Sequence, residues 1–304
     1  MKHLLVTGFS GFVGKNCREY FEGSSEIKIV PFDRHEFSLI GEQSAQFSNI
    51  DAVLHLAGKA HDLKNTDSSQ EYYEVNTELT KRIFNSFLAS DANVFITLSS
   101  VKAVADQVGG ELIEQHQPNP VTHYGKSKLL AEQYIFSKEI PEGKRVYVLR
   151  PCMIHGPGNK GNLNLLYKIV SKNIPWPLGA FENMRSFCSI DNLMFIFKEL
   201  IERQDIPSGI YNVADDEPLS TNDLIGLIAQ SQNRNPKLWN ISRKFIGWVA
   251  SIGDKLHLPL NTERLQKLTS SYVVNNAKIK AAIGKPLPVS SREGLLKTFK
   301  SFNS

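Results

Sequence analysis

The sequence predicts an α/β fold, in which a doubly wound parallel sheet is followed by a smaller C-terminal region. Two observations lead to this prediction. Short apolar runs alternate with segments of helical periodicity through the first half of the chain, and a glycine-rich turn follows the first apolar run. Strands that alternate with helices form a parallel sheet with helices packed on both faces.

The expected elements follow one another regularly up to residue 155. Buried strands are expected at the apolar runs 3–8, 27–33, 51–58, 93–100 and 145–151. Helices are expected between them at 12–23, 75–90 and 124–140, where apolar residues form a stripe. Such an order is typical of a chain built from strand–helix–strand units.

The alternation becomes less regular in the second half of the chain. Residues 155–162 contain three glycines and one proline, which predicts a loop. Beyond this loop we expect a helix at 163–172, a strand entering a helix at 186–203, a strand and turn at 209–220, a helix at 221–232, and mostly helical structure over 241–304. Thr221 is the expected N-cap of the helix that it begins.

Composition bounds the class of protein. The chain has 304 residues, of which 41% are hydrophobic and 22% charged, and this is ordinary for a globular protein. The net charge of +4 comes from lysines and arginines that are spread along the chain. Nucleic-acid-binding proteins concentrate their positive charge, so no nucleic-acid partner is expected. The mild basicity suits an anionic small substrate.

The cysteines and the apolar runs bear on the compartment. Cys17, Cys152 and Cys188 lie far apart without metal-ligand spacing, so we expect buried free thiols and no metal site. The N-terminal apolar run is too short for a signal segment, and no apolar stretch approaches the ~18 residues of a membrane span. We therefore expect a cytoplasmic protein that does not insert into a membrane.

The glycine-rich turn "TGFSGFVG" predicts a dinucleotide site. Gly8, Gly11 and Gly14 follow the first strand, while Phe12 and Val13 open the helix. Glycine lets the backbone turn tightly and approach a pyrophosphate, and the helix N-terminus presents unpaired N–H groups to the phosphates. A glycine turn without a ligand is the alternative, but the position after the first strand favours the nucleotide.

The end of the second strand bears on the choice of cofactor. Asp33 can accept hydrogen bonds from both hydroxyls of an adenosine ribose, which favours NAD. Arg34 follows at once and could attract a 2′-phosphate, so NADP stays open; Asp33 is also compatible with a simple turn cap. These signals place an NAD(P)-binding domain of the Rossmann type at 1–160 and a mainly substrate-binding region at 161–304, with some elements of 186–215 packing back onto the first domain.

Two tyrosine–lysine pairs share the spacing of one helical turn, and position decides between them. Tyr124 and Lys128 begin the helix at 124–140, whereas Tyr134 and Lys138 lie at its far end, about 15 Å along the axis. Ser100 ends the fourth strand, at the sheet edge where ligands bind. A neighbouring ammonium lowers the pKa of a tyrosine that acts as a base. Tyr124, Lys128 and Ser100 are therefore the candidate catalytic residues.

An ordered set of motifs resembles the extended short-chain dehydrogenases/reductases, in their nucleotide-sugar epimerase/dehydratase branch. The resemblance covers nearly the whole chain and is carried by TGFSGFVG, DAVLHLAG, VNTELT, LSS, HYGKSK, RPCMIHGPG, RSFCSIDNL and YNVADDEP. It implies that Ser100, Tyr124 and Lys128 form the catalytic triad. It also implies that residues 8–14 and Asp33 hold the dinucleotide.

Further cofactor contacts are implied by the same resemblance. Leu56, Ala57 and Gly58 would line the cofactor cleft, and Pro151 would contribute at the end of its strand. Tyr124 and Lys128 would also contact the cofactor, Lys128 at the nicotinamide ribose.

Candidate substrate residues lie in the second half of the chain. The resemblance implies that Arg185 binds the substrate diphosphate, for which a guanidinium fork is well suited. Arg264 is a second candidate for this role. Asn162 or Asn164 would bind the diphosphate or the sugar, although capping of the loop is an equal alternative for each. His155 stands where the family usually has tyrosine, which either tunes the sugar pocket or has little effect.

One departure from the family pattern argues against dehydration. Sugar 4,6-dehydratases of this family follow the triad hydroxyl with an Asp-Glu pair, and here Val101 and Lys102 stand in those places. Valine cannot donate a proton, and lysine cannot act as the acidic partner. Dehydratase activity is therefore not expected.

Three functions remain open at this stage. The first is an NAD-dependent 4-epimerase of UDP-hexoses or UDP-N-acetylhexosamines, and the second is an NAD(P)H-dependent reductase of a UDP-4-keto-6-deoxy-N-acetylhexosamine. Residues 158–187 are similar to those of bacterial enzymes that make such UDP-sugars for surface polysaccharides. The third, a non-catalytic dinucleotide sensor, has no need of a complete triad. A homodimer through two helices per subunit is usual for the family.

Overall fold

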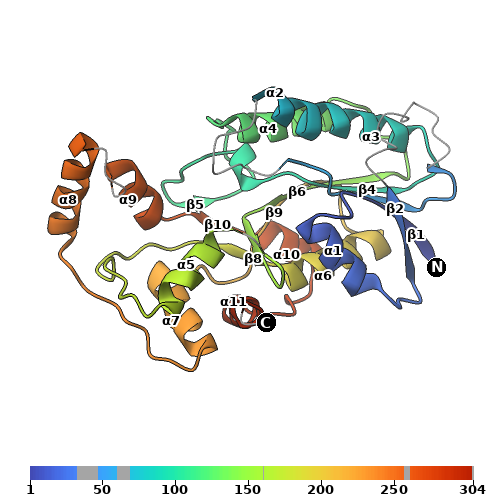
Figure 1. The fold of residues 1–304 in the computed structure, drawn as a ribbon. Coiled ribbons are helices and arrows are strands. Elements are labelled where there is room, and N and C mark those ends of the chain that lie inside the picture. The colour runs from blue at the N-terminus through green and yellow to red at the C-terminus, as the bar shows by residue number, and fades with distance from the viewer. Residues whose placement is uncertain (33–46, 60–68, 160, 257–260, 303–304) are drawn as a thin grey trace.

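A six-stranded parallel sheet forms the centre of the computed structural model, which describes residues 1–32, 47–59, 69–159, 161–256 and 261–302. Its strand order is β2-β1-β3-β4-β6-β9 (Figure 1). The strands are β1 (Lys2–Thr7), β2 (Ile27–Phe32), β3 (Ala52–His55), β4 (Val94–Leu98), β6 (Arg145–Pro151) and β9 (Gly209–Val213). The sheet and its helices confirm the α/β fold class that the sequence predicts.

Helices cover both faces of the sheet because the strand side chains alternate between two cores. Leu4 and Val6 of β1 belong to the core beneath α1 (Phe12–Phe21), α6 (Ile190–Glu202) and α10 (Ala277–Ile283). Leu5 belongs to the opposite core, beneath α3 (Leu79–Leu88) and α4 (His123–Phe136). A strand covered on both faces has a continuous apolar run, as β1 has at residues 4–6.

The strand order changes direction between β1 and β3, and this places the ligand crevice. The chain goes outward from β1 to β2 and then returns to pair β3 on the other side of β1. At such a switch point the loops after the two strands separate to opposite faces and leave a crevice beyond the carboxyl ends. The glycine turn and residues 56–58 flank this crevice.

The remaining elements form a second group of cores next to the sheet. Helices α5 (Asn162–Ser171), α7 (Thr221–Ser231) and α11 (Ser291–Lys300) pack together with β8 (Phe187–Ser189), which pairs β7 (Met153–His155). Helices α8 (Arg243–Leu256) and α9 (Thr262–Thr269) form a further cluster at one end of the molecule (Figure 1). The short strands β5 (Glu111–Leu112) and β10 (Val273–Val274) pair near the carboxyl ends of β4 and β6.

Three expected element boundaries are corrected by the structure. The helix expected at 75–90 is α2 (Ser69–Tyr73), a π-helical turn η3 (Glu74–Glu78) and α3, and the turn buries Asn76. The helix expected to reach residue 140 ends at Phe136. The N-cap of α7 is Ser220 rather than Thr221, because the Ser220 hydroxyl accepts the N–H of Asp223, whose carboxylate accepts the Ser220 N–H in return.

Candidate active site

The glycine turn fits a narrow space against the loop that follows β3. Gly8 has a φ of +70°, and a Cβ on it would lie 2.6 Å from the backbone nitrogen of Ala57. A Cβ on Gly14 would lie 2.4 Å from the carbonyl oxygen of Gly8. No other residue type can occupy these two positions without moving the backbone. The helix α1 begins directly after the turn, with Gly11 as N-cap and no side chain bonded to its first N–H groups.

A buried histidine holds the β3 loop against the β1 end, and the sequence analysis did not single it out. His55 Nδ1 lies 2.8 Å from Thr7 Oγ1, which in turn accepts the N–H of Ala57 at 3.1 Å. The other ring nitrogen lies 3.0 Å from Thr80 Oγ1 on α3. Burial, with a smaller effect of Lys128, lowers the pKa of His55 to about 3, so the ring is neutral. The signal was present in the sequence as a polar residue inside the apolar run DAVLHLAG.

The structure brings Ser100 and Tyr124 into contact across the carboxyl end of β4. Burial of the phenol raises the pKa of Tyr124, the nearby Ser100 side chain lowers that pKa by a smaller amount, and Tyr72 adds to the rise. The contact requires Gly125, because a Cβ there would lie 2.3 Å from the carbonyl oxygen of Lys102. The first turn of α4 therefore packs directly on the turn that follows Ser100.

Lys128 lies one helical turn after Tyr124 and points its ammonium into the sheet edge. Its Nζ donates to the carbonyl oxygen of Leu98 at 2.8 Å, and a Cβ on Gly58 would lie 3.1 Å from it. Burial lowers the pKa of Lys128 to about 8, against the opposing effect of Glu132. The lysine thus lies between the ends of β4 and β3, where the predicted cofactor residues converge.

A buried ion pair lies behind this group and was missed by the sequence analysis. Arg150 Nη2 lies 2.5 Å from Glu132 Oε2, and both side chains are 3% exposed. Ser99 donates its hydroxyl to the same carboxylate. Ser99 stands between Leu98, whose carbonyl receives Lys128, and Ser100. Through Ser99, the ion pair therefore connects the carboxyl end of β4 to α4, next to the candidate catalytic residues.

A second polar cluster fixes the start of α4 to the η3 turn. Asn76 accepts the N–H of Lys59 at 2.8 Å and donates to Ser127 Oγ at 3.0 Å. Thr77 donates to the carbonyl oxygen of Ser127 at 2.8 Å. Because Ser127 lies between Tyr124 and Lys128 on α4, these bonds set the rotation of the helix that carries both.

The buried ammonium of Lys128 makes stability depend on pH. Its pKa falls from 10.5 to about 8 on folding, so the charged form costs on the order of 1–3 kcal/mol below pH 8. Replacing Lys128 by methionine is expected to raise the free energy of unfolding at pH 7 by up to that amount. The advantage should shrink as the pH rises from about 8 towards 10.5, where the wild-type lysine becomes neutral in both states. Urea unfolding at pH 7 and pH 9.5 measures it, and an equal difference at both values would contradict the assignment.

The predicted diphosphate residue Arg185 makes contacts that the sequence analysis did not foresee. Its Nε donates to the carbonyl oxygen of Ser270 at 3.0 Å, and its Nη2 donates to the carbonyl oxygen of Lys267. These carbonyls end helix α9, so the guanidinium stabilises the negative end of that helix. Burial lowers the pKa of Arg185. Arg264 lies on α9 itself and is exposed.

Of the residues in the substrate prediction, Asn164 and His155 make local contacts in the structure. Asn164 Oδ1 accepts the N–H of Gly161 at 3.1 Å, which is the capping alternative, and Asn162 is exposed. His155 is fully buried, with its Nδ1 2.9 Å from Thr298 Oγ1 and its Nε2 3.4 Å from Asp215 Oδ2. These contacts give His155 a structural role between β7 and α11.

The remaining predicted residues fall partly outside the described chain. Asp33 and Arg34, the two residues predicted to bear on the choice between NAD and NADP, lie outside the described residues. Pro151 is buried at the end of β6.

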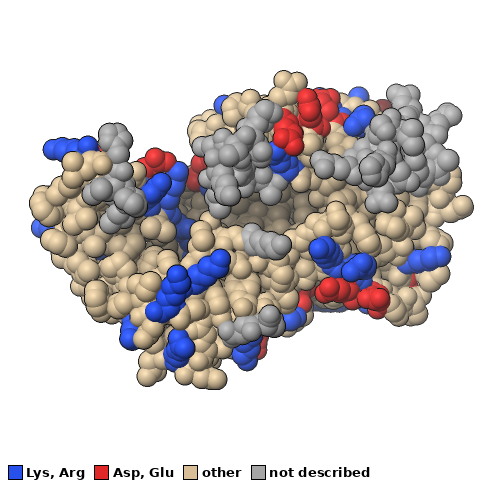
Figure 2. Space-filling view, in the orientation of Figure 1, with Lys and Arg blue, Asp and Glu red and all other residues tan. Residues whose placement is uncertain are grey.

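Within the described ranges, no helix is long and apolar enough to cross a membrane, and no three His, Cys, Asp or Glu side chains are grouped to hold a metal. A hollow is visible in the middle of the molecular face shown in Figure 2.

Comparison with known proteins agrees with this geometry. The family described as NAD dependent epimerase/dehydratase matches residues 4–214. The chain is 27% identical to a UDP-glucose 4-epimerase of Vibrio cholerae, over 99% of this chain and 95% of the relative. It is 27% identical to an N-acetyl-alpha-D-glucosaminyl-diphospho-ditrans,octacis-undecaprenol 4-epimerase of Escherichia coli O157:H7, over 76% and 73% of the two chains.

A reductase and a solved structure complete the comparison. The chain is 26% identical to a UDP-2-acetamido-2,6-beta-L-arabino-hexul-4-ose reductase of Pseudomonas aeruginosa, over 56% of this chain and 41% of the relative. The UDP-glucuronic acid 4-epimerase of Bacillus cereus, solved with NAD, has the same fold with a TM-score of 0.76 at 18% identity, over 99% of this chain and 98% of that one. The glycine turn, the strand order and the matched residues together show that this chain belongs to the NAD-dependent epimerase/dehydratase family.

Proposed function

We propose that the chain is an NAD-dependent 4-epimerase of a UDP-hexose or UDP-N-acetylhexosamine, serving the synthesis of surface polysaccharide precursors. The broader class, a nucleotide-sugar epimerase or reductase, follows from the family and from the relatives. The observation that carries an enzymatic function is the placement of Ser100 beside the Tyr124 phenol at the carboxyl end of β4, one turn from the buried Lys128. The similarity to two 4-epimerases supports the epimerase form of this function.

The crevice fits a dinucleotide because glycines line it where no side chain could be accommodated, so that the backbone itself can approach the cofactor. Gly8, Gly14 and Gly58 each lie where a Cβ would come within 3.1 Å of another group. The unpaired N–H groups at the start of α1 are suited to the pyrophosphate. Lys128, next to Gly58, would hold the nicotinamide ribose. Bound NAD supplies the hydride acceptor, and the chain supplies orientation and proton transfer.

In this proposal each triad residue has a separate task at the sugar C4 hydroxyl. Ser100 donates a hydrogen bond to the C4 oxygen and orients it towards Tyr124. Tyr124 removes the hydroxyl proton as the C4 hydrogen leaves as hydride, and returns a proton to the oxygen when hydride comes back. Charged Lys128 favours the phenolate form of Tyr124 through its positive charge. Epimerisation requires the 4-keto sugar to present its opposite face between the two transfers.

A 4-keto reductase is the second candidate, because the same residues can deliver a proton to a carbonyl oxygen. One observation favours it, the similarity to the Pseudomonas reductase. Such an enzyme would receive a ready-made keto sugar. A sensor without turnover would not need the Ser100–Tyr124 contact.

The nucleotide released on denaturation separates these candidates. An epimerase returns its own hydride and can keep its cofactor, whereas a reductase must exchange cofactor in every turnover. We expect the purified protein to release NAD+ in near-equal amount when it is denatured, as measured by chromatography of the supernatant. An empty site that binds NADPH or NADH reversibly would overturn the epimerase proposal and favour the reductase.

Arg185 tests whether the substrate is a nucleoside diphosphate. Replacing it by alanine is expected to weaken UDP binding by on the order of 1.5–3 kcal/mol, because a charge-assisted pair is lost. Titration calorimetry with UDP measures the effect. Hydrogen exchange in α9 shows whether the helix has also loosened, since Arg185 binds its last carbonyls. Arg292→Ala on α11 is the control, and unchanged UDP affinity in Arg185→Ala would remove this arginine from the site.

A further inference from the structure

Helix α8 lies at one end of the molecule (Figure 1). It exposes a stripe of apolar side chains. Phe245 is 54% exposed, Trp248 is 60% exposed and Leu256 is 64% exposed, and the partly exposed Ile252 lies between them. The rings of Phe245 and Trp248 lie side by side with centroids 6.0 Å apart. Single exposed apolar residues are common, but a continuous apolar stripe on one helix indicates an interaction surface.

The stripe lies opposite the side of α8 that packs on the protein. Ile246 and Ala250 are buried in the core that α8 shares with α9 and Trp176. At about 100° per residue, Phe245, Trp248, Ile252 and Leu256 occupy the outward arc, spaced three and four residues apart. The helix is therefore apolar on both its inner and its outer side, and only the inner side is covered by described residues.

Positive charges border the outward arc. Lys244 and Lys255 lie at its edge, next to Trp248, by the same helical geometry. Within 233–256 the one acidic residue is Asp254, while the segment holds five cations, Arg234, Lys237, Arg243, Lys244 and Lys255. Trp239 precedes the helix and is 57% exposed.

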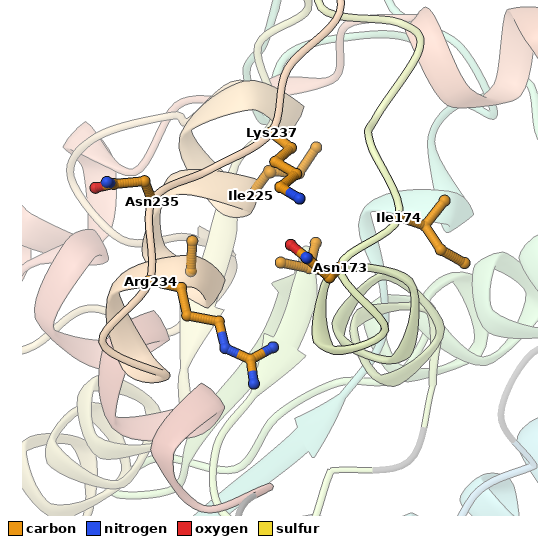
Figure 3. A pocket seen from close by; sticks show the side chains of 8 residues that line it. Asn173, Ile174, Ile225, Arg234, Asn235 and Lys237 are labelled. Atoms are coloured by element: carbon orange, nitrogen blue, oxygen red, sulfur yellow. The ribbon is translucent and has the colours of Figure 1, made fainter.

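The segment between α7 and α8 extends the basic surface. Arg234 and Lys237 line a shallow pocket with Asn173 and Asn235, and Figure 3 shows both cations pointing towards it. Lysine and arginine side chains also gather at this side of the molecule in Figure 2. Acidic side chains here have partners: Asp254 accepts the N–H of Thr262 at 3.1 Å, Glu182 lies 3.7 Å from Arg243, and Glu263 lies 2.5 Å from Lys267 on α9.

We propose that the outward face of α8, defined by Phe245, Trp248, Ile252 and Leu256 with Lys244 and Lys255, docks on the surface of an anionic membrane. A helix that presents aromatic and aliphatic side chains bordered by lysine binds parallel to the interface. Tryptophan and the lysine stems are suited to the headgroup region, where one part of the side chain is apolar and the other is wet. The basic segment 234–244 adds attraction to anionic headgroups.

Charge favours a membrane over a second copy of the chain as the occupant. A two-fold interface through this face would bring each positive border against itself, because the same patch is used on both subunits. Like charges in contact oppose association, whereas anionic headgroups neutralise them. The proposal concerns docking on the surface and goes beyond the catalytic function.

Vesicle co-sedimentation tests the docking surface with the full chain. We expect the protein to sediment with vesicles of phosphatidylglycerol and phosphatidylethanolamine at low salt, and to bind phosphatidylcholine vesicles less. High salt should weaken the binding. Phe245→Glu/Trp248→Glu is expected to weaken it by at least about tenfold, because two apolar anchors become charged and repel the headgroups. Turnover in solution, away from vesicles, should be retained by this variant, which shows that it is folded.

The control substitutes an exposed aromatic residue at a distance from α8. Tyr20 on α1 is 43% exposed, and Tyr20→Glu should leave vesicle binding unchanged. Three results would overturn the proposal: no sedimentation of the wild type with anionic vesicles, equal loss in Tyr20→Glu, or a wild-type dimer that becomes monomeric only in Phe245→Glu/Trp248→Glu. The last result would show that a second copy covers the face.

Discussion

Replacing Tyr124 by phenylalanine is expected to lower the turnover number by about 10²–10⁴-fold, the usual contribution of a positioned acid or base. The change removes one oxygen atom and leaves the ring that packs against Tyr72, with centroids 6.2 Å apart. Binding of the dinucleotide should persist, because the glycine turn and the β3 loop are not altered. Steady-state kinetics and cofactor titration measure the two quantities separately.

The second tyrosine–lysine pair on α4 supplies a matched control. Tyr134 donates to Asn85 Oδ1 at 2.8 Å, and Lys138 lies 4.8 Å from the centroid of its ring. Tyr134→Phe should therefore cost about 0.5–1.5 kcal/mol of stability and leave turnover nearly unchanged. If Tyr124→Phe retained most of its activity, or if Tyr134→Phe lost as much, the assignment of the base would fail.

Removing Glu132 is expected to have the largest effect on stability. Glu132→Ala would leave Arg150 charged and buried, and breaking a buried pair in this way costs about 3–5 kcal/mol. The Ser99 hydroxyl would lose its acceptor as well. Chemical unfolding of the two proteins measures the difference. Because Ser99 lies next to Ser100, turnover should fall together with stability.

A double replacement separates the unpaired charge from the lost packing. Glu132→Ala/Arg150→Met removes both charges, and its stability should exceed that of Glu132→Ala alone, since the buried arginine no longer lacks a partner. The Nη1 atom of Arg150 already has no hydrogen-bond partner among the described residues, which adds to the cost of leaving it charged. A double variant less stable than Glu132→Ala would show that the ion pair is not the source of the effect.

Much of the fold was predictable because its signals are local. The apolar runs lie where β1, β3, β4 and β6 form, because strands covered on both faces are mostly apolar. Boundaries were less predictable. The cap of α7 depends on which of two neighbouring hydroxyls reaches the N–H of Asp223, and only the folded turn selects Ser220. The π-helical turn at Glu74–Glu78 has no sequence signature of this kind.

For the site, the sequence by itself determined which residue types stand at the strand ends: the glycines after β1, Ser100 after β4, and the tyrosine and lysine that begin α4. Position along the helix, not spacing, already separated Tyr124 from Tyr134. The tertiary structure alone decided how they are held. The side chains behind the site have partners that are distant in the chain. His55 is hydrogen-bonded to Thr7, and Glu132 binds both Ser99 and Arg150.

The contacts of Arg185 and the exposure of the α8 surface also depend on residues that are distant in the chain, so the sequence did not predict them. Nothing near Arg185 in the sequence indicates that its guanidinium ends a helix more than 80 residues away, because that contact exists only once α9 has packed. The outward stripe of α8 likewise looks like an ordinary helix face in the sequence. Which of its two apolar sides is buried depends on the neighbours that folding brings to the helix. The hydrophobic effect favours the burial of either side equally, so only the packed neighbours decide.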